Sequence, residues 1–576
     1  MKTTFRSLCA ALATLFVVIS GFTQPAQAAD NATTTKTYKI MALGDNITEG
    51  SSTFNSYIFP LWEKLLKAGY VVEFVGPNAT QTRIGNLQNA GVGTQTAEYI
   101  DANITTTYTK YPADIVLLHA GHNHTVEENP VAGIVAAHKS IIAKIRAVNP
   151  NVKILVAQVI TSGKLPKYSY IPELNKQLAT LVSELSAAGQ AVSLVNQAEG
   201  FDWSKDCISD MVHPNAAGAA KMATKWLEGM QKVMDTPEES YNPEVVIYKR
   251  PTGAPLELHI FKPANIPAGE KRPAIIFFFG GGWSSGTPLQ FYREAYYYAS
   301  KGMVAVCADY RIVNTHGTTP FESIKDAKSA LRWLRVNASK YGIDTDKIVA
   351  SGGSAGGHLA AACGTLKLWD EPTEDLTVSS KPNLMILNYP VVDNGPTGYG
   401  PTSFRAEYLT VSPLHNIDAT TPPCLTILGT KDNLVPVATA QLFQQKMRDL
   451  NIESELILYE NAVHPIFSYQ KGKSADYYKM LGQSEAFLVK HGYISQAGTS
   501  VCQSKKESEY SVFPNPTADV LSVTGLTNDE QIALYNIKGE QMPVRLSQNQ
   551  ISLSDMPEGL YMLFINQQPF RVLVSR

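Results

Sequence analysis

Two long stretches of the sequence alternate strand-length apolar runs with helix-length amphipathic runs, and this pattern constrains the fold more than any other feature. In the first stretch, residues 36–234, we predict strands at 39–43, 71–75, 115–118 and 154–159, and helices at 57–68, 131–148, 174–187 and 215–233. Such alternation produces a parallel sheet with helices on both faces. The first domain is therefore predicted to be a doubly wound α/β/α sheet, with any site at the carboxyl ends of its strands.

The second stretch, residues 244–494, repeats the pattern after an acidic boundary segment with two prolines. We predict strands at 274–279, 304–308, 348–351, 384–388, 424–428 and 455–459, and helices at 290–301, 320–340, 357–368 and 439–450. The length of this stretch suits one large α/β domain with a mostly parallel sheet.

The ends of the chain differ from these two domains. Residues 1–28 combine a basic start, an apolar run and small residues at a cleavage position, which is typical of a secretory signal peptide. Residues 510–576 carry short alternating runs between turn residues, which predicts a small β-sandwich after a polar linker at 496–509. Three folded domains thus account for 576 residues, where length alone predicts about four.

Composition excludes several classes of function. The 49 Lys and Arg residues nearly balance the 51 Asp and Glu residues, so the chain lacks the basic excess that nucleic-acid binding requires. Beyond the leader, no apolar run reaches the roughly 18 residues of a transmembrane segment. Cleavage leaves five scattered cysteines, which excludes a disulfide-built fold; one bridge is possible, and its pairing stays open.

The second domain contains a candidate nucleophile. Gly352-Gly353-Ser354-Ala355-Gly356 follows an apolar run and opens a helical pattern, which is the context of a nucleophile elbow. Ser354 is the predicted nucleophile. The amides of Gly281 and Gly282, in a triple-glycine turn after another strand, and of Ala355 are predicted to form the oxyanion hole.

An acid and a base follow the nucleophile in the order typical of this kind of hydrolase. Asp432 follows one predicted strand and His464 follows the last. His464 is predicted to take the serine proton and return it to the leaving group, while Asp432 fixes the imidazole tautomer. Asp393 is a weaker candidate for the acid. Trp283 is predicted to border the acyl pocket.

These motifs, together with Ala308-Asp309-Tyr310-Arg311 and the helical segment 326–335, resemble the hormone-sensitive-lipase-like α/β-hydrolases. Within that branch the similarity is to bacterial acetylxylan and feruloyl esterases, and it covers nearly all of the second domain. It implies an α/β-hydrolase fold and a serine esterase without a cofactor. Four charged residues are better interpreted as structural ion-pair partners than as catalytic groups: Asp309, Arg311, Asp326 and Arg332.

Three loops of the first domain resemble the SGNH (GDSL-type) hydrolases, especially carbohydrate acetylesterases. They are Gly44-Asp45-Asn46-Ile47-Thr48-Glu49-Gly50, Gly121-His122-Asn123-His124 and Asp210-Met211-Val212-His213-Pro214-Asn215. The resemblance implies a flavodoxin-type sheet with a site at Asn46, Asn123, Asp210 and His213. The family has its nucleophilic serine where this chain has Asn46. Because an amide has no hydroxyl for His213 to activate, we predict a catalytically silent domain that binds glycan or only scaffolds its neighbour.

The histidines near this site raise the question of a metal. His119, His122 and His124 have a spacing that transition-metal ligands use. The SGNH-like loop already explains their position, and no acidic or cysteine ligand accompanies them in the sequence. We therefore expect no metal.

The C-terminal motifs Phe513-Pro514-Asn515-Pro516, residues 534–539 and Pro557-Glu558-Gly559-Leu560-Tyr561 resemble the sorting domain of type IX secretion cargo. That resemblance implies passage to the outside or to the cell surface, with the type IX machinery as a partner.

The resulting expectation is a secreted or surface-attached serine carbohydrate esterase. Its substrate is expected to be an acetylated or feruloylated plant polysaccharide or oligosaccharide, such as xylan. One alternative is a general carboxylesterase or lipase acting on small esters. A non-enzymatic alternative is a glycan-binding cell-surface protein in which Ser354 is idle.

Overall fold

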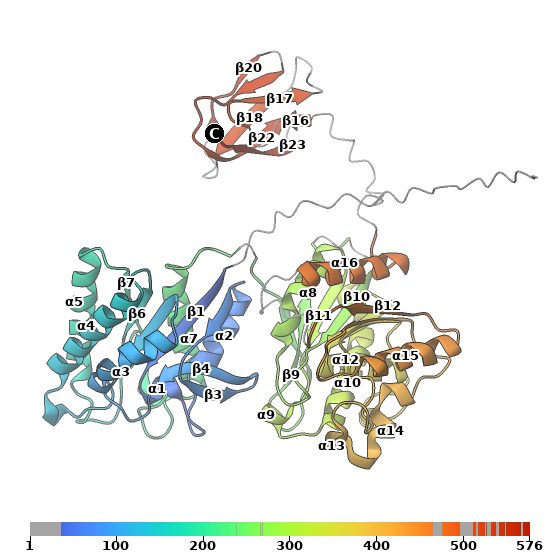
Figure 1. Cartoon of the computed structure of the whole chain (residues 1–576), viewed down its shortest axis with the longest axis horizontal. Helices are drawn as coiled ribbons and strands as arrows, with labels where there is room; N and C mark the ends of the chain where they lie inside the picture. Colours follow the sequence, from blue (N-terminus) through green and yellow to red (C-terminus); the bar gives the residue numbers. More distant parts are fainter. Residues whose placement is uncertain are drawn as a thin grey trace, which may run out of the picture. The chain divides into compact units, whose positions relative to one another are not determined.

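The computed structural model describes residues 36–464 except 238, 265 and 268, then 475–495, and 511–576 with short gaps (Figure 1). The predicted leader and linker lie outside the described residues. The chain forms two compact units, Met1–Ile494 and Ser495–Arg576, and the first unit contains both large domains.

The first domain is built on a seven-stranded sheet in the order β3-β4-β1-β5-β6-β7, with β2 also paired to β1. Its strands are β1 Thr37–Gly44, β2 Val71–Phe74, β3 Asn78–Thr82, β4 Gly85–Gly91, β5 Ile115–His119, β6 Lys153–Gln158 and β7 Val192–Asn196. Its helices are α1 Asn46–Glu49, α2 Ile58–Lys67, α3 Ala97–Lys110, η1 Val126–Glu128, α4 Val131–Val148, α5 Ile171–Ala187, α6 Trp203–Asp206 and α7 Ala216–Gln231.

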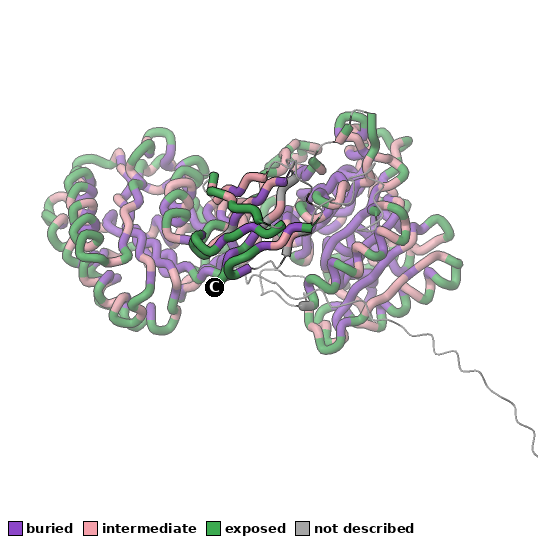
Figure 2. The backbone as a smooth tube through the Cα atoms, turned by 90° about the horizontal axis from the view of Figure 1, so that it is seen from above, coloured by how far each residue is buried: buried purple, intermediate pink, exposed green. Residues whose placement is uncertain are grey.

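The predicted α/β/α architecture of the first domain is confirmed. Every strand pair except β3–β4 is parallel. Two separate apolar clusters cover the two faces of the sheet, and α2 and α7 pack on one face while α3, α4 and α5 pack on the other. The sheet strands form the purple, buried interior of Figure 2.

The second domain has an eight-stranded sheet in the order β15-β14-β13-β12-β10-β11-β9-β8. Its strands are β8 Glu244–Lys249, β9 Leu256–Phe261, β10 Arg272–Phe278, β11 Val304–Ala308, β12 Ile343–Gly353, β13 Leu384–Asn388, β14 Cys424–Gly429 and β15 Ser454–Tyr459. Its helices are η2 Pro288–Phe291, α8 Tyr292–Ser300, α9 Val313–His316, α10 Pro320–Val336, α11 Ala338–Tyr341, α12 Ala355–Thr365, α13 Pro401–Phe404, η3 Arg405–Glu407, α14 Tyr408–Val411, η4 Pro413–His415, α15 Val437–Asp449 and α16 Ala475–Lys490.

The predicted α/β-hydrolase sheet is also confirmed, and the structure adds an antiparallel edge. Strands β8 and β9 pair antiparallel, β9 pairs antiparallel with β11, and the remaining pairs are parallel. Central strands such as β11 and β13 are buried at every position, which explains their continuous apolar runs.

The C-terminal unit is a small antiparallel sandwich, as predicted. One sheet has the order β16-β17-β21-β20 and the other β19-β18-β22-β23. The strands are β16 Ser511–Phe513, β17 Val520–Thr524, β18 Ile532–Asn536, β19 Gln541–Met542, β20 Arg545–Ser547, β21 Gln550–Ser552, β22 Gly559–Ile565 and β23 Gln568–Val574. Its core includes Leu521, Leu534 and Leu563, each fully buried.

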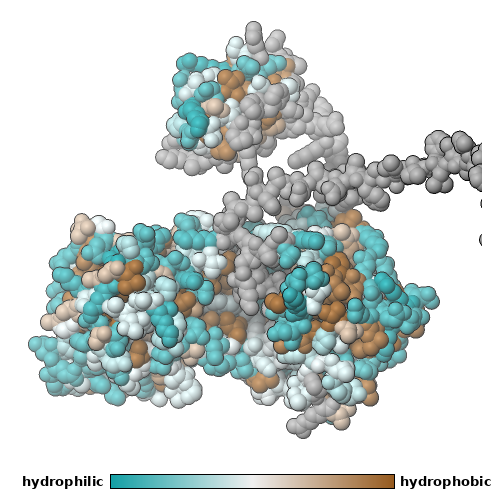
Figure 3. Space-filling model, viewed as in Figure 1, coloured by the Kyte–Doolittle hydropathy of each residue, from teal (hydrophilic) through white to brown (hydrophobic). Residues whose placement is uncertain are grey.

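Hydrophilic residues cover most of the visible face of both large domains in Figure 3, with apolar residues in smaller patches. Among the described residues, every helix is too short or too polar to span a bilayer. The four cysteines within the described ranges, Cys207, Cys307, Cys363 and Cys424, are buried free thiols.

Candidate active site

Ser354 lies at the sharp turn between β12 and α12. Its φ of 56° is in the left-handed region, and its amide donates to the carbonyl of Asn388 at 3.0 Å. A Cβ at Gly356 would lie 2.0 Å from the carbonyl oxygen of Phe278, so only glycine permits this close approach of helix and strand. The glycines of the motif therefore hold a strained serine at the carboxyl end of a central strand.

The three predicted triad residues come together although they are far apart in the sequence. The Ser354 hydroxyl lies 3.0 Å from Nε2 of His464, and Nδ1 of His464 lies 2.7 Å from Oδ2 of Asp432. The imidazole therefore bridges the hydroxyl and the carboxylate. This geometry orients Nε2 as the acceptor of the serine proton.

The carboxylate of Asp432 is held in its ionised form. Burial raises its pKa, but hydrogen bonds outweigh that effect and lower the pKa below its ordinary value. The donors are the His464 ring and the amides of Leu434 and Val435, which reach Oδ1 at 2.9 and 2.8 Å. An ionised Asp432 keeps the proton of His464 on Nδ1 and leaves Nε2 free as a base.

The triple-glycine turn after β10 has the backbone geometry of an anion site. Gly281 and Gly282 have φ values of 133° and 60°, which favour glycine. Their amides have no hydrogen-bond acceptor among the described residues. The amide of Gly280, in contrast, donates to the side chain of Gln290 at 2.5 Å, which fixes the start of the turn.

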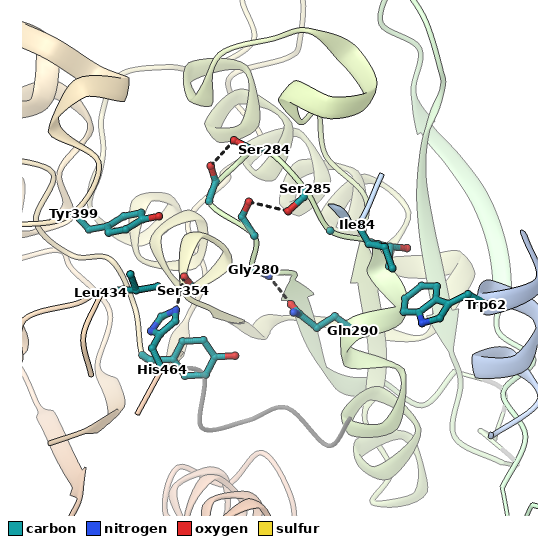
Figure 4. Close-up of a pocket in the computed structure, with 15 residues that line it drawn as sticks. Trp62, Ile84, Gly280, Ser284, Ser285, Gln290, Ser354, Tyr399, Leu434 and His464 are labelled. Atoms are coloured by element: carbon teal, nitrogen blue, oxygen red, sulfur yellow. Dashed lines mark hydrogen bonds between the residues drawn. The ribbon is translucent and has the colours of Figure 1, made fainter. Parts of the chain in front are cut away.

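A cavity of about 580 Å³ opens beside Ser354 and His464 (Figure 4). Its wall is mixed in polarity and is formed by Trp62, Ile84, Gly280, Gly281, Gly282, Ser284, Ser285, Gly286, Thr287, Gln290, Ser354, Tyr389, Tyr399, Leu434 and His464. Two of these residues, Trp62 and Ile84, belong to the first domain.

Trp283 does not line this cavity, contrary to the sequence expectation. Its φ of 56° turns the side chain into the core, where it is 1% exposed. The indole packs edge-to-face on His358 and Phe404, with ring centroids 5.1 and 5.2 Å apart. Tyr399, whose ring centroid lies 6.2 Å from that of Trp283, lines the cavity instead.

The weaker candidate Asp393 is also not part of the triad. Its carboxylate accepts hydrogen bonds from the Gly395 amide at 2.8 Å and from the Thr397 hydroxyl at 3.1 Å. It therefore stabilises its own loop.

The four charged residues predicted to be structural all form ion pairs. Arg311 binds the fully buried Asp326, with Nε–Oδ2 at 2.7 Å, and Arg332 pairs with Asp370. Asp309 pairs with Arg83 of the first domain, a partner that no sequence pattern predicts.

The SGNH-like site of the first domain is assembled around Asn46. Its Nδ2 contacts Nε2 of His213, and its Oδ1 accepts from Nδ2 of Asn123 at 3.2 Å. Nδ1 of His213 bonds Asp210. Burial raises the pKa of Asp210, but the bonds from His213 and Val212 lower it below its ordinary value overall. Asn46 therefore forms hydrogen bonds with the neighbours of the nucleophile position but has no hydroxyl that could attack an ester.

The three histidines near this site do not converge. His124 pairs with Glu98 and Glu128 at 3.0 and 2.7 Å. Instead, one potential ligand atom each of Asp45, His119 and His122 lies within 4.8 Å of the others, and all three side chains are buried. Burial lowers the pKa of His119 to about 4, so its imidazole is neutral.

Comparisons with known proteins agree with this division into domains. Residues 42–221 match the GDSL-like Lipase/Acylhydrolase family, and residues 511–572 match the Secretion system C-terminal sorting domain. In the second domain, residues 258–407 match BD-FAE and residues 394–487 match the Dienelactone hydrolase family.

Several of the individual relatives are named as esterases. Esterase LipC of Mycobacterium tuberculosis is 27% identical over 33% of this chain and 52% of its own length. An acetylxylan esterase of Xylanibacter ruminicola is 26% identical over 35% of this chain and 42% of its length. The solved structure of a thermophilic esterase from Thermogutta terrifontis is 41% identical, covers 44% of this chain and 95% of its own, and has a TM-score of 0.43.

The chain spans between about a third and a half of the length of the first curated relatives it matches. The domain assignments rest on the family matches together with the folds described above. The chain therefore joins a GDSL-like lipase domain, an α/β-hydrolase domain and a secretion-system C-terminal sorting domain, in that order.

Proposed function

We propose that the second domain is a serine esterase that removes acetyl or feruloyl groups from a plant polysaccharide such as xylan. The observation that carries this proposal is the bridge of His464 between Ser354 and Asp432 at the edge of an open cavity.

In this mechanism Ser354 attacks the ester carbonyl while Nε2 of His464 takes its proton. The amides of Gly281, Gly282 and Ala355 stabilise the oxyanion of the tetrahedral intermediate. The imidazolium then gives its proton to the leaving alcohol, which is the sugar hydroxyl. Water, activated by the same imidazole, attacks the acyl-enzyme, and the carboxylic acid leaves as Ser354 regains its proton.

Support for the substrate comes from outside the triad. A relative at 26% identity is an acetylxylan esterase, and the sorting domain implies the secretion machinery and hence an external substrate. A general carboxylesterase acting on small esters is the second candidate, because another relative is named only as an esterase.

The first domain is proposed to be catalytically silent. Asn46 fills the nucleophile position, and its Oδ1 accepts a hydrogen bond from Nδ2 of Asn123. The remaining donors leave a polar site without a nucleophile.

The decisive experiment compares wild type with Ser354→Ala on acetylated xylan and on feruloylated xylan. We expect wild type to release acetate or ferulate and Ser354→Ala to lose at least about 10³-fold of that rate. Ser300→Ala, which changes an exposed serine of α8, is the matched control and should keep full activity. Equal release by wild type and Ser354→Ala would overturn Ser354 as the nucleophile. No release by wild type on any ester would favour the non-enzymatic, glycan-binding alternative, and activity on small esters alone would favour the general carboxylesterase.

A further inference from the structure

A turn of the first domain reaches the esterase cavity of the second. Strands β3 and β4 form an antiparallel hairpin, and its turn carries Arg83 and Ile84. Ile84 and Trp62, which is on the neighbouring helix α2, both line the cavity. In Figure 4 these two side chains lie across the cavity from Ser354 and His464.

The turn is fixed to the second domain by specific polar contacts. Nε of Arg83 donates to the carbonyl of Gly286 at 2.8 Å, and the Gly286 amide donates back to the carbonyl of Arg83 at 3.1 Å. The guanidinium also holds both carboxylate oxygens of Asp309. A bidentate pair of this kind fixes orientation as well as distance.

These contacts are buried and lie next to the oxyanion turn. The side chains of Arg83 and Asp309 are 18% and 7% exposed. A Cβ at Gly286 would lie 2.4 Å from the Phe279 ring and 2.5 Å from the Gly280 carbonyl. The loop to which Arg83 is hydrogen-bonded therefore packs directly on the glycine turn that is proposed to hold the oxyanion. The first domain is thus docked beside the esterase cavity.

The part of the cavity that the first domain contributes has the chemistry of a sugar site. Trp62, which is 7% exposed, contributes aromatic atoms to the lining and Ile84 contributes apolar ones. The same lining includes Ser284, Thr287 and Gln290, which carry hydroxyl and amide groups. Aromatic faces beside neutral hydrogen-bonding groups suit the apolar faces and hydroxyls of a pyranose ring.

We propose that Ile84 and Trp62 bind a neutral sugar unit of the substrate beyond the one that carries the ester, so that the GDSL-like domain sets the specificity of the neighbouring esterase. Arg83 is the positioning residue that holds this wall in place. The proposal rests on the proposed esterase function and deepens it. It gives the nucleophile-less domain a role that does not use its own SGNH-like site.

The test compares two substrates on each variant: an acetylated xylo-oligosaccharide of four to six units and 4-nitrophenyl acetate, which has no second sugar. Ile84→Trp places a larger side chain at this wall and so reduces the space for a second sugar unit. We expect its kcat/KM for the oligosaccharide to fall about tenfold, mostly through KM, and its kcat/KM for 4-nitrophenyl acetate to stay within about twofold. Asn86→Trp places the same bulk on an exposed position of the same hairpin and should change neither value.

A second variant tests the anchor without changing the cavity wall. Arg83→Lys keeps the charge but removes the planar guanidinium that binds both the Gly286 carbonyl and the Asp309 carboxylate. We expect it to shift the ratio of the two kcat/KM values in the same direction as Ile84→Trp, with little change on 4-nitrophenyl acetate. An unchanged ratio in both variants overturns the proposal while wild-type activity stands. Absence of esterase activity in the wild-type protein would instead overturn the proposed function.

Discussion

The side chain of Asn46 forms two hydrogen bonds at the position where a nucleophilic serine would react. Its Nδ2 faces the imidazole of His213, and its Oδ1 occupies the amide donor of Asn123. The arrangement explains why His213 and Asp210 keep their mutual geometry although the nucleophile is absent.

This geometry predicts that Asn46→Ser restores hydrolysis in the first domain. In a Ser354→Ala background, the new hydroxyl would face His213 and free the Asn123 donor. We expect the rate on 4-nitrophenyl acetate to rise by roughly 10²-fold over that background, the lower end of what a positioned general base contributes. Adding His213→Ala should remove the gain, and a rise that survives this change would contradict the assignment of the base.

Asp432 acts on the reaction only through His464. Asp432→Asn keeps the size of the side chain but removes the charge that holds the proton on Nδ1. We expect kcat to fall about 10³- to 10⁴-fold with KM nearly unchanged. The matched change Asp393→Asn, in a carboxylate that accepts from Gly395 and Thr397 and is not part of the triad, should leave kcat within a few fold. Steady-state kinetics on 4-nitrophenyl acetate measure both variants.

At the scale of elements, local patterns predicted the strands and helices that build the two sheets. Buried parallel strands such as β5 and β13 are continuous apolar runs, and the elbow at Ser354 needs glycines that are visible in the sequence. The hairpin β3–β4 was missed because its residues are mostly polar. The buried positions of β4 include Asn89 and Gly91 as well as Leu87, so no apolar alternation is visible in the sequence.

The cavity wall could not be predicted for a different reason. The triad residues could be predicted from motifs at strand ends. Ile84 and Trp62 line the same cavity only because the two domains dock, and no local sequence pattern encodes that contact. Trp283 is not a pocket residue because its indole packs in the core against His358 and Phe404. The three histidines do not form one cluster because His124 pairs with Glu98 and Glu128.

Helix α8 carries a buried carboxylic acid that should make stability depend on pH. Burial raises the pKa of Glu294 to about 7, although Tyr477 and Arg293 oppose the shift. Between its ordinary value of 4.5 and 7, Glu294 keeps a proton in the folded state that it has lost in the unfolded state, so its contribution to stability falls as pH rises through this window. The loss amounts to about 3 kcal/mol at 1.36 kcal/mol per pKa unit.

Glu294→Gln removes this titration. Because the buried histidines titrate alike in both proteins, we compare the two at each pH. We expect the free energy of unfolding of the variant to increase relative to that of wild type as pH rises from 5 to 7.5, and its stability at pH 7.5 to exceed that of wild type. Denaturant unfolding at several pH values measures the effect. Glu184→Gln, at an exposed position of α5, should retain the wild-type slope, and the same slope in Glu294→Gln would show that another group causes it.

At the scale of the whole molecule, the two compact units divide the tasks of the chain. The first holds both hydrolase-type domains and the candidate active site, and the second is the sorting sandwich. The sandwich has its own apolar core, closed between two four-stranded sheets. An independent core is what a transferable export signal requires, because it must fold on any cargo.

The sandwich core should therefore be necessary for export. A fluorescent reporter with an N-terminal secretory leader and residues 496–576 at its C-terminus should leave the cells of a type IX-secreting bacterium, either to the medium or to the surface. Leu563→Asp buries a charge in the sandwich core and should trap the reporter in the periplasm. Leu546→Asp makes the same change at a side chain that is 47% exposed and should leave export intact. Quantifying fluorescence in the medium, surface and periplasmic fractions measures the difference, and export of the Leu563→Asp reporter at the wild-type level would show that the folded sandwich is not what the machinery recognises.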